Sequence, residues 1–150
     1  MKQLKENKYK SLSQNELNAL LEDLDLQQSA PSEDWLILLV AKTGLRCTEA
    51  LGITPNDFDF TAQALTVNKT RDWGSGFRPS KNPPRTVSLD PEISVCFEVL
   101  VDGLPQNSPI FAAETAATVN AILADHCSHA GVPVITMHGL RHTHVILHAM

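Results

Sequence analysis

The spacing of apolar residues changes twice along this chain, and that change constrains the fold more than any other feature of the sequence. Up to about residue 53, apolar residues recur at the intervals of a helix with one buried face. Between residues 64 and 90 the pattern alternates as in strands, around a segment rich in glycine and proline. Helical spacing then returns. This order predicts an α+β fold that is mostly helical, with a small antiparallel sheet of two or three strands at about residues 64–90.

Local signals predict where several helices begin and end. Ser13 stands one helical turn before Glu16, which is the reciprocal capping arrangement at a helix start. The next helical segment is apolar from Trp35 to Ala41, and a face this broad predicts a central, buried helix. Gly44 can then provide the left-handed residue that ends this helix.

Composition is that of an ordinary globular domain. Apolar residues make up 43% and charged residues 19% of 150 residues, which fits one domain and argues against disorder. No apolar run approaches the roughly 18 residues that a membrane span needs, and the N-terminus lacks the apolar stretch of a secretory signal. We therefore expect a cytoplasmic protein with no membrane partner. Cys47, Cys96 and Cys127 form no C-x-x-C pair, so reduced thiols are expected.

Charge is distributed unevenly along the chain. The formal net charge is −5, which taken alone argues against a nucleic-acid partner. A basic strip with a single acid, Asp72, nevertheless contains Lys69, Arg71, Arg78, Lys81 and Arg85. Because salt confines the influence of each charge to about 10 Å, such a strip can meet a DNA backbone even on an acidic protein. The strip predicts either phosphate contacts or a solvated loop.

Three short motifs follow one another along the chain. They are "TGLRCTEALGI" at 43–53, "RPSKNPPRTVSL" at 78–89 and "HGLRHTH" at 138–144. Together, in this order and spacing, they resemble the catalytic domain of the tyrosine recombinases, the phage integrase family. The resemblance implies a site-specific recombinase of a phage or mobile element that breaks and rejoins DNA through a 3′-phosphotyrosine intermediate, without a cofactor.

The resemblance gives roles to a small set of residues. Negative charge builds up on two nonbridging phosphate oxygens in this reaction, and guanidinium groups stabilise it. Arg46 and Arg141 match the two family arginines that do so. Lys81 matches the hairpin lysine that protonates the leaving 5′-hydroxyl, with Lys69 as a second candidate. His138, one helical turn before Arg141, is expected to hydrogen-bond the same phosphate or to assist the proton transfer.

Other polar residues near these motifs have two interpretations each. Glu49 is expected to brace the Arg46 guanidinium, although a plain surface acid is the alternative. His142 and His144 fit structural histidines better than catalytic ones. The segment "HCSH" at 126–129 offers at most three zinc ligands and no fourth, so no metal is expected. The remaining basic residues are candidate phosphate contacts: Lys69, Arg71, Arg78 and Arg85.

The nucleophile is the missing part of this pattern. In the family a tyrosine follows the second arginine, whereas the one tyrosine here, Tyr9, precedes Arg46. We therefore expect no nucleophile in this chain and no covalent DNA adduct by the chain alone. The sequence is interpreted as a single, incomplete catalytic domain over residues 1–150, in which 1–12 resemble a linker. The core-binding domain and the tyrosine-bearing segment are expected to be absent.

Two function hypotheses from different classes stay open. The first is an inactive catalytic-domain fragment of a bacterial or phage-encoded integrase, an enzyme that binds double-stranded DNA and acts as a homo-oligomer on it. The second is a naturally truncated, non-catalytic DNA-binding or interaction module of the same fold. A metal-dependent hydrolase built on the C-terminal histidines is a third, remote alternative, which a stoichiometric zinc signal would support.

Overall fold

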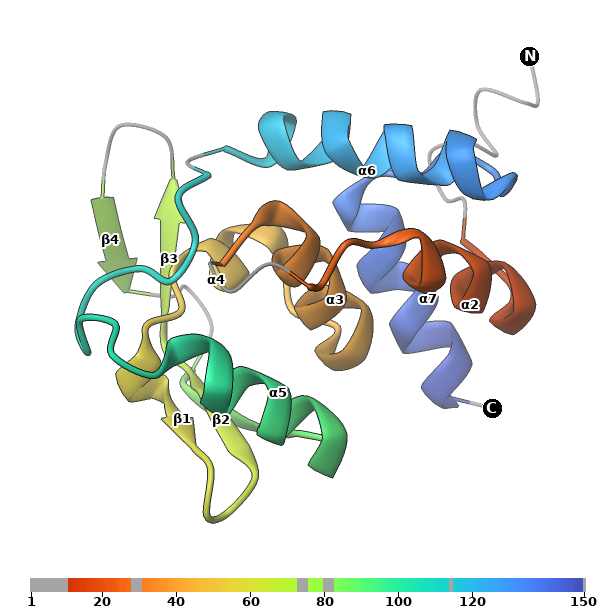
Figure 1. Cartoon of the computed structure of the whole chain (residues 1–150). Helices are drawn as coiled ribbons and strands as arrows, with labels where there is room; N and C mark the ends of the chain where they lie inside the picture. Colours follow the sequence, from red (N-terminus) through yellow and green to blue (C-terminus); the bar gives the residue numbers. More distant parts are fainter. Residues whose placement is uncertain (1–10, 28–30, 73–75, 80–82, 114, 150) are drawn as a thin grey trace.

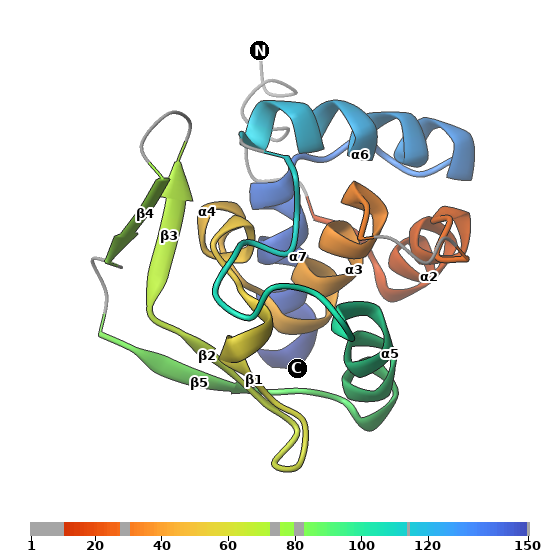
Figure 2. The same cartoon turned by 60° about the vertical axis from the view of Figure 1, so that its left-hand side comes forward.

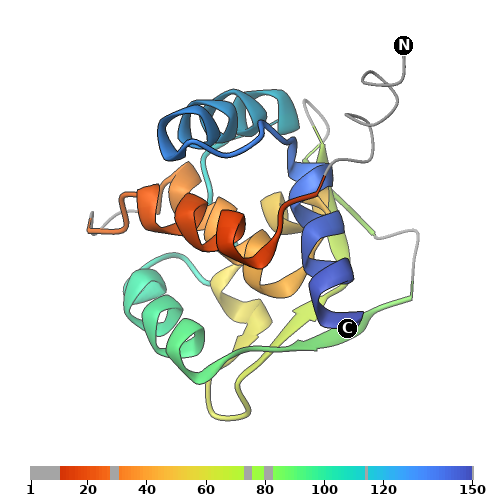
Figure 3. The same ribbon diagram turned by 90° about the vertical axis from the view of Figure 1, so that its right-hand side faces the viewer.

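Helix α3 (Glu33–Thr43) lies at the centre of the molecule, and the other elements are arranged around it (Figure 1). This computed structural model describes residues 11–27, 31–72, 76–79, 83–113 and 115–149. Helices α2 (Gln14–Asp23), α6 (Ala116–Ala130) and α7 (Met137–Ala149) pack on one side of α3 (Figure 3). The strands and α5 (Pro91–Val101) lie on its other side (Figure 2). The chain thus has the predicted α+β architecture, mostly helical with a small antiparallel sheet.

The helix ends follow from the predicted capping residues. The Glu16 backbone N–H donates to the Ser13 hydroxyl at 3.2 Å, while the Ser13 N–H donates to the Glu16 carboxylate at 2.8 Å. Helix α3 is buried at every position from Trp35 to Ala41, because it is surrounded by other elements. It ends at Gly44, whose φ of 74° is the left-handed conformation that glycine adopts without strain. Both boundary predictions are confirmed.

The strands form two small sheets instead of one. Strands β1 (Phe58–Asp59), β2 (Ala64–Val67) and β5 (Arg85–Ser88) make an antiparallel sheet in the order β1-β2-β5, and Leu65 pairs with Val87. Strands β3 (Lys69–Asp72) and β4 (Gly76–Pro79) form a separate two-stranded ribbon. The sheet therefore begins earlier than the predicted residue 64. Phe58 explains this start, because it packs face to face on both Phe60 and Phe97 and holds β1 against α5.

The β3-β4 ribbon is attached to the short helix α4 (Cys47–Leu51). A Cβ atom on Gly52 would lie only 3.2 Å from the carbonyl carbon of Thr70, so glycine allows the close approach of β3 at this point. The guanidinium of Arg71 donates to the carbonyl oxygens of Leu51 at 2.8 Å and of Phe111 and Ala113 at 2.6 Å each. These bonds fix the ribbon to the domain.

Helix α7 is tied to the start of the chain as well as to α3. The Thr143 hydroxyl is buried, accepts a 3.0 Å hydrogen bond from the Leu12 N–H and donates to the Gly139 carbonyl at 2.8 Å. Both α7 and α4 are thereby held at fixed positions relative to the core, which matters because each carries residues of the candidate site. No helix in the described ranges is long and apolar enough to cross a membrane.

Candidate phosphate-binding site

Three arginines from three different elements surround one buried carboxylate. Arg46 is the residue before α4, where the chain turns after Gly44; Arg85 begins β5; and Arg141 lies in the second turn of α7. All three line an open hollow of about 540 Å³. Glu49, on the first turn of α4, is 1% exposed and lies beneath them. We call this set, Arg46, Glu49, Arg85 and Arg141, the arginine hollow.

Glu49 is bound mainly by Arg85. Both terminal nitrogens of Arg85 donate to its carboxylate, Nη1 to Oε2 at 2.8 Å and Nη2 to Oε1 at 2.9 Å. The Arg46 backbone N–H donates to Oε1 at 2.9 Å, but the Arg46 side chain approaches only to 3.9 Å, from Nη1 to Oε2. Burial raises the pKa of Glu49, but the hydrogen bonds from Arg85 and from the Arg46 backbone outweigh this effect and hold the pKa below its ordinary value. The carboxylate is therefore ionised.

Arg141 lacks a partner that the fold normally gives to a buried donor. Its Nη1 atom is buried and makes no hydrogen bond to any residue in the described part of the chain. Burial lowers the pKa of Arg141, and the positive charge of Arg46 lowers it further, whereas the charge of Glu49 raises it. The hollow therefore holds a guanidinium with one terminal nitrogen that the described residues leave without a hydrogen bond. An anion placed between Arg46 and Arg141 would satisfy it.

His138 lies beside the same two arginines. A second hollow, of about 330 Å³, is lined by Arg46, His138 and Arg141 together with Cys47. His138 is exposed, at the start of α7, so its ring is accessible to a ligand. Cys47 does not offer an alternative nucleophile, because burial raises the pKa of its thiol to about 11. The fold thus brings Arg46, His138 and Arg141 to one place, as the motifs predicted.

The hairpin residues divide into those near the hollow and those used elsewhere. Lys81 lies outside the described residues, and so does the side chain of Arg78. Pro83 and Pro84, which follow Lys81 in the sequence, line the arginine hollow. Lys69 forms an ion pair with Asp57, with 2.6 Å between Nζ and Oδ2, on the side of the domain where the 3-10 helix Pro55–Asp57 lies.

Two predicted phosphate contacts thus have partners within the protein. Arg71 donates to three backbone carbonyls, as described above, and Lys69 pairs with a carboxylate. Arg85 lines the hollow, but its terminal nitrogens are bonded to Glu49. These pairings could not be predicted from local sequence patterns, because each joins residues that are distant along the chain.

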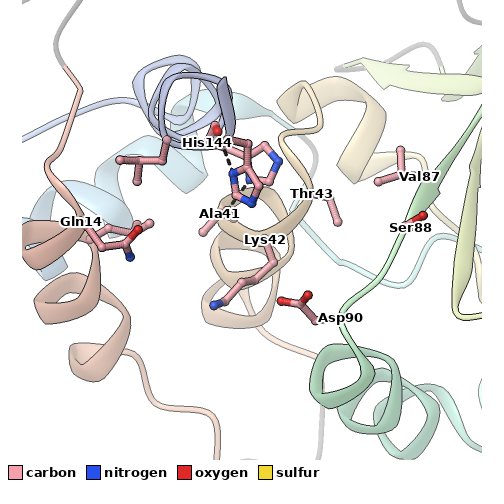
Figure 4. Close-up of a pocket in the computed structure, with 11 residues that line it drawn as sticks. Gln14, Ala41, Lys42, Thr43, Val87, Ser88, Asp90 and His144 are labelled. Carbon is pink, nitrogen blue, oxygen red and sulfur yellow. Dashed lines mark hydrogen bonds between the residues drawn. The ribbon is translucent and has the colours of Figure 1, made fainter. Parts of the chain in front are cut away.

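His144 has a structural position next to the hollow. Its Nδ1 donates to the Ala41 carbonyl at 3.0 Å, which connects α7 to the end of α3 (Figure 4). Its ring stacks on His148 with 3.9 Å between the ring centroids. A Cβ atom on Gly44 would come within 2.5 Å of the His144 ring, so glycine is needed here for contact as well as for conformation. His142 is half-buried.

A second charged cluster, which the sequence did not reveal, joins α6 to α2 and α3. His126 bridges two carboxylates, with Nδ1 2.8 Å from Asp23 Oδ2 and Nε2 2.8 Å from Asp34 Oδ1. His129 forms a short contact with the other oxygen of Asp23. Cys127 is fully buried, and the described residues contain no group of side chains that could hold a metal ion. We call His126, His129, Asp23 and Asp34 the histidine clamp.

Comparison with known proteins gives one family and one fold. Residues 10–146 match the Phage integrase family. The Tn1549 transposon integrase, solved in complex with transposon right end DNA, has a TM-score of 0.69 at 19% identity, covering 91% of this chain and 52% of that one. XerA recombinase has a TM-score of 0.69 at 21% identity, covering 93% and 50%. An integrase from mycobacterium phage Brujita has a TM-score of 0.63 at 23% identity, covering 90% and 42%.

The structural matches and the family match support different conclusions. At such identities the solved structures show a shared fold, and this chain spans about half of their length. No curated protein matches the chain. The match over residues 10–146 covers all three motifs and every residue of the arginine hollow.

Proposed function

Because the chain belongs to the phage integrase family, we propose that it forms the phosphate-binding part of a site-specific DNA recombinase. In this proposal the arginine hollow receives the scissile phosphate of double-stranded DNA. The Tn1549 transposon integrase and the XerH recombinase, both solved with DNA, support DNA as the ligand class. DNA occurs inside the cell, so we also propose the bacterial cytoplasm as the location.

The observation that carries the proposal is the Nη1 atom of Arg141, which is buried and has no hydrogen-bond partner among the described residues. Folded proteins rarely leave a buried hydrogen-bond donor without a partner unless a ligand supplies one. Here the donor lies next to Arg46, whose side chain is 50% exposed, in a hollow with three guanidiniums and one carboxylate. That excess of positive charge matches a phosphodiester, which brings one negative charge and two nonbridging oxygens.

The reaction assigns a task to each group. A tyrosine oxygen attacks phosphorus, the bond from phosphorus to the 5′-oxygen breaks, and the 3′-phosphate becomes joined to tyrosine. Arg46 and Arg141 would donate to the nonbridging oxygens, where negative charge grows as the bond forms. Lys81 would give its proton to the leaving 5′-oxygen, and His138 would either hydrogen-bond the phosphate or take up the proton that the attacking tyrosine hydroxyl loses. No step requires a metal or an organic cofactor.

The nucleophile is not part of this proposal for the chain alone. Its one tyrosine, Tyr9, precedes Arg46 in the sequence and lies outside the described residues. We propose that the chain binds DNA without forming a covalent adduct, and that recombination needs a longer protein that adds the tyrosine and assembles as a homo-oligomer on DNA. The same arginine hollow also fits a second candidate, a non-catalytic DNA-binding module of the same fold.

Binding to a fluorescein-labelled DNA duplex in low salt tests the proposed ligand. We expect Arg46→Gln to lower the affinity about tenfold, because one of the two phosphate-facing guanidiniums is lost. Lys42→Gln is the matched control, since Lys42 is exposed on α3 and outside the arginine hollow (Figure 4). Equal losses of affinity in both variants would mean that DNA binding depends only on the overall charge of the protein, and would contradict the proposed site.

A nicked suicide duplex separates the recombinase from the non-catalytic module. A longer protein that joins this chain to a following tyrosine-bearing segment should leave a covalent protein–DNA band. The band should be lost when that tyrosine is replaced by phenylalanine. If a longer natural protein binds the duplex but forms no band, the non-catalytic module is the better description.

A further inference from the structure

Arg85 differs from the other two arginines of the hollow in how its charge is used. Its side chain is 36% exposed, and both of its terminal nitrogens already donate hydrogen bonds to Glu49. Arg46 is 50% exposed and leaves a 3.9 Å gap to the same carboxylate. Arg141 has an unpartnered terminal nitrogen among the described residues. A phosphate entering the hollow would therefore find Arg46 and Arg141 ready to donate, and Arg85 occupied.

Glu49 would compete with that phosphate if Arg85 were absent. A carboxylate that is 1% exposed has almost no water to bind, so it must take its partners from the protein. Besides Arg85, the only side-chain cation that forms an ion pair with it in the described residues is Arg46. Closing the 3.9 Å gap would draw the Arg46 guanidinium down onto Glu49 and away from the hollow.

We infer that Arg85 is a positioning residue: by occupying Glu49 it keeps the Arg46 guanidinium directed at the scissile phosphate. The inference rests on the proposed function and deepens it. Glu49 in turn fixes the backbone N–H of Arg46 by a 2.9 Å hydrogen bond, so the pair anchors the residue at its main chain and leaves its side chain available.

This role connects the hairpin to the centre of the site. Arg85 is the first residue of β5, and its backbone pairs with Val67 of β2. Glu49 lies in the first turn of α4. The Arg85–Glu49 ion pair thus fixes the strand that follows the hairpin to the helix that follows Arg46. A bidentate pair of this kind sets orientation as well as distance, which a single-point contact cannot do.

A double-mutant cycle on the isolated chain tests the inference, with the labelled DNA duplex as the probe. Arg85→Gln should lower DNA affinity about tenfold, because Glu49 then captures Arg46. In a Glu49→Gln background the same change should cost no more than about twofold, because the competing carboxylate is gone. If Arg85 instead contacts a phosphate directly, its loss costs the same in both backgrounds, and the inference is overturned.

The pH dependence of DNA binding separates positioning from a purely structural role. The charged groups that face Glu49 are Arg46 from just before α4, Arg85 from β5 and Arg141 from α7, and His138 lines the adjoining hollow. Without Arg85, burial should raise the pKa of Glu49, so protonation at low pH would release Arg46. The affinity of Arg85→Gln should therefore recover as the pH falls, beyond any change in the double variant, which shares the same histidines. Parallel pH profiles would contradict the inference.

Two further variants complete the experiment. Arg85→Lys keeps the charge but loses the bidentate contact, so its affinity should lie between those of wild type and Arg85→Gln; it also serves if Arg85→Gln does not fold by circular dichroism. Affinity in Arg85→Lys as low as in a folded Arg85→Gln would contradict capture of Arg46 by an unpaired Glu49. Arg46→Gln is the reference for the site itself. If Arg46→Gln leaves binding unchanged, the proposed function fails; if it weakens binding while Arg85 and Glu49 act additively, only the positioning role fails.

Discussion

The arginine hollow and the histidine clamp are both clusters of charged side chains from distant parts of the sequence, yet they are completed in different ways. In the clamp, each ring nitrogen of His126 meets a carboxylate oxygen, and Asp23 has a second histidine on its other oxygen. In the hollow there are three guanidiniums and one carboxylate, which pairs with Arg46 and Arg85, and Nη1 of Arg141 has no hydrogen-bond partner in the described part of the protein.

This difference separates a cluster that holds the fold together from one that awaits a ligand. In the clamp both ring nitrogens of His126 and both oxygens of Asp23 have partners, and these bonds join three helices. The hollow keeps an excess of positive charge that disfavours the folded state until an anion enters. Removing a residue from the clamp should therefore change stability, whereas removing one from the hollow should change binding.

The largest expected effect is on DNA binding by Arg141→Met. We expect the affinity for a short duplex in low salt to fall about thirtyfold, since a buried guanidinium that donates to phosphate is lost. The melting temperature should stay the same or rise. Burial and the charge of Arg46 lower the pKa of Arg141, which means that both disfavour its charged form in the folded protein. Fluorescence anisotropy and thermal denaturation measure the two quantities.

A large fall in the melting temperature of Arg141→Met would show that Arg141, like His126, stabilises the fold. A folded variant that binds DNA as well as the wild type would show that Arg141 does not contact the phosphate. Met is the matched replacement because it keeps most of the length of the arginine side chain and removes only the charge and the donors.

The next effect in size is on stability, in the clamp. His126→Gln should lower the free energy of unfolding by about 1.5 kcal/mol, because hydrogen bonds to two carboxylates are weakened. DNA affinity should not change. Chemical denaturation followed by tryptophan fluorescence is suitable, because Trp35 lies in α3 beside Asp34. A variant as stable as the wild type would show that the clamp contributes nothing to the fold.

The smallest effect is on the pH dependence of stability. Burial lowers the pKa of His126, but hydrogen bonds to Asp23 and Asp34 raise it above its ordinary value. Its stabilisation is then complete below about pH 6.5 and is lost as the pH rises through the raised pKa. Burial lowers the pKa of His144 despite its hydrogen bond to Ala41, so its contribution has the opposite sign. That stability is present above about pH 6.5 and is lost as the pH falls.

Melting temperatures of two variants separate these contributions. His126→Gln should remove part of the decline in stability on the alkaline side, and His144→Gln should remove part of the decline on the acidic side, each by less than about 1 kcal/mol. If both variants change stability on the same side of the pH profile, the direction assigned to one of the two histidine pKa shifts is wrong.

The sequence predicted those features that depend on neighbouring residues. Ser13 and Glu16 are one turn apart, and Gly44 directly follows the helix that it ends, so a local pattern was sufficient. The extra strand β1 was missed, because its two residues are held by the stacking of Phe58 on the distant Phe97, and not by any local alternation.

The candidate site was predicted in part for a related reason. Arg46, His138 and Arg141 stand in motifs, and the fold brings them together. The partners of Glu49 and His126 were not predicted, because Arg85 is 36 residues from Glu49, and Asp23 is 103 residues from His126. Charged residues are common on every surface, so a pairing across such separations leaves no mark in a single sequence. For the same reason the carbonyl contacts of Arg71 were not predicted.

A crystal structure of this chain bound to a short DNA duplex tests the central claim most directly. We expect one phosphate that accepts hydrogen bonds from both Arg46 and Arg141, with Nη1 of Arg141 among the donors and Arg85 still bonded to Glu49. A duplex bound on another face, or a bound phosphate that touches neither guanidinium, would contradict it.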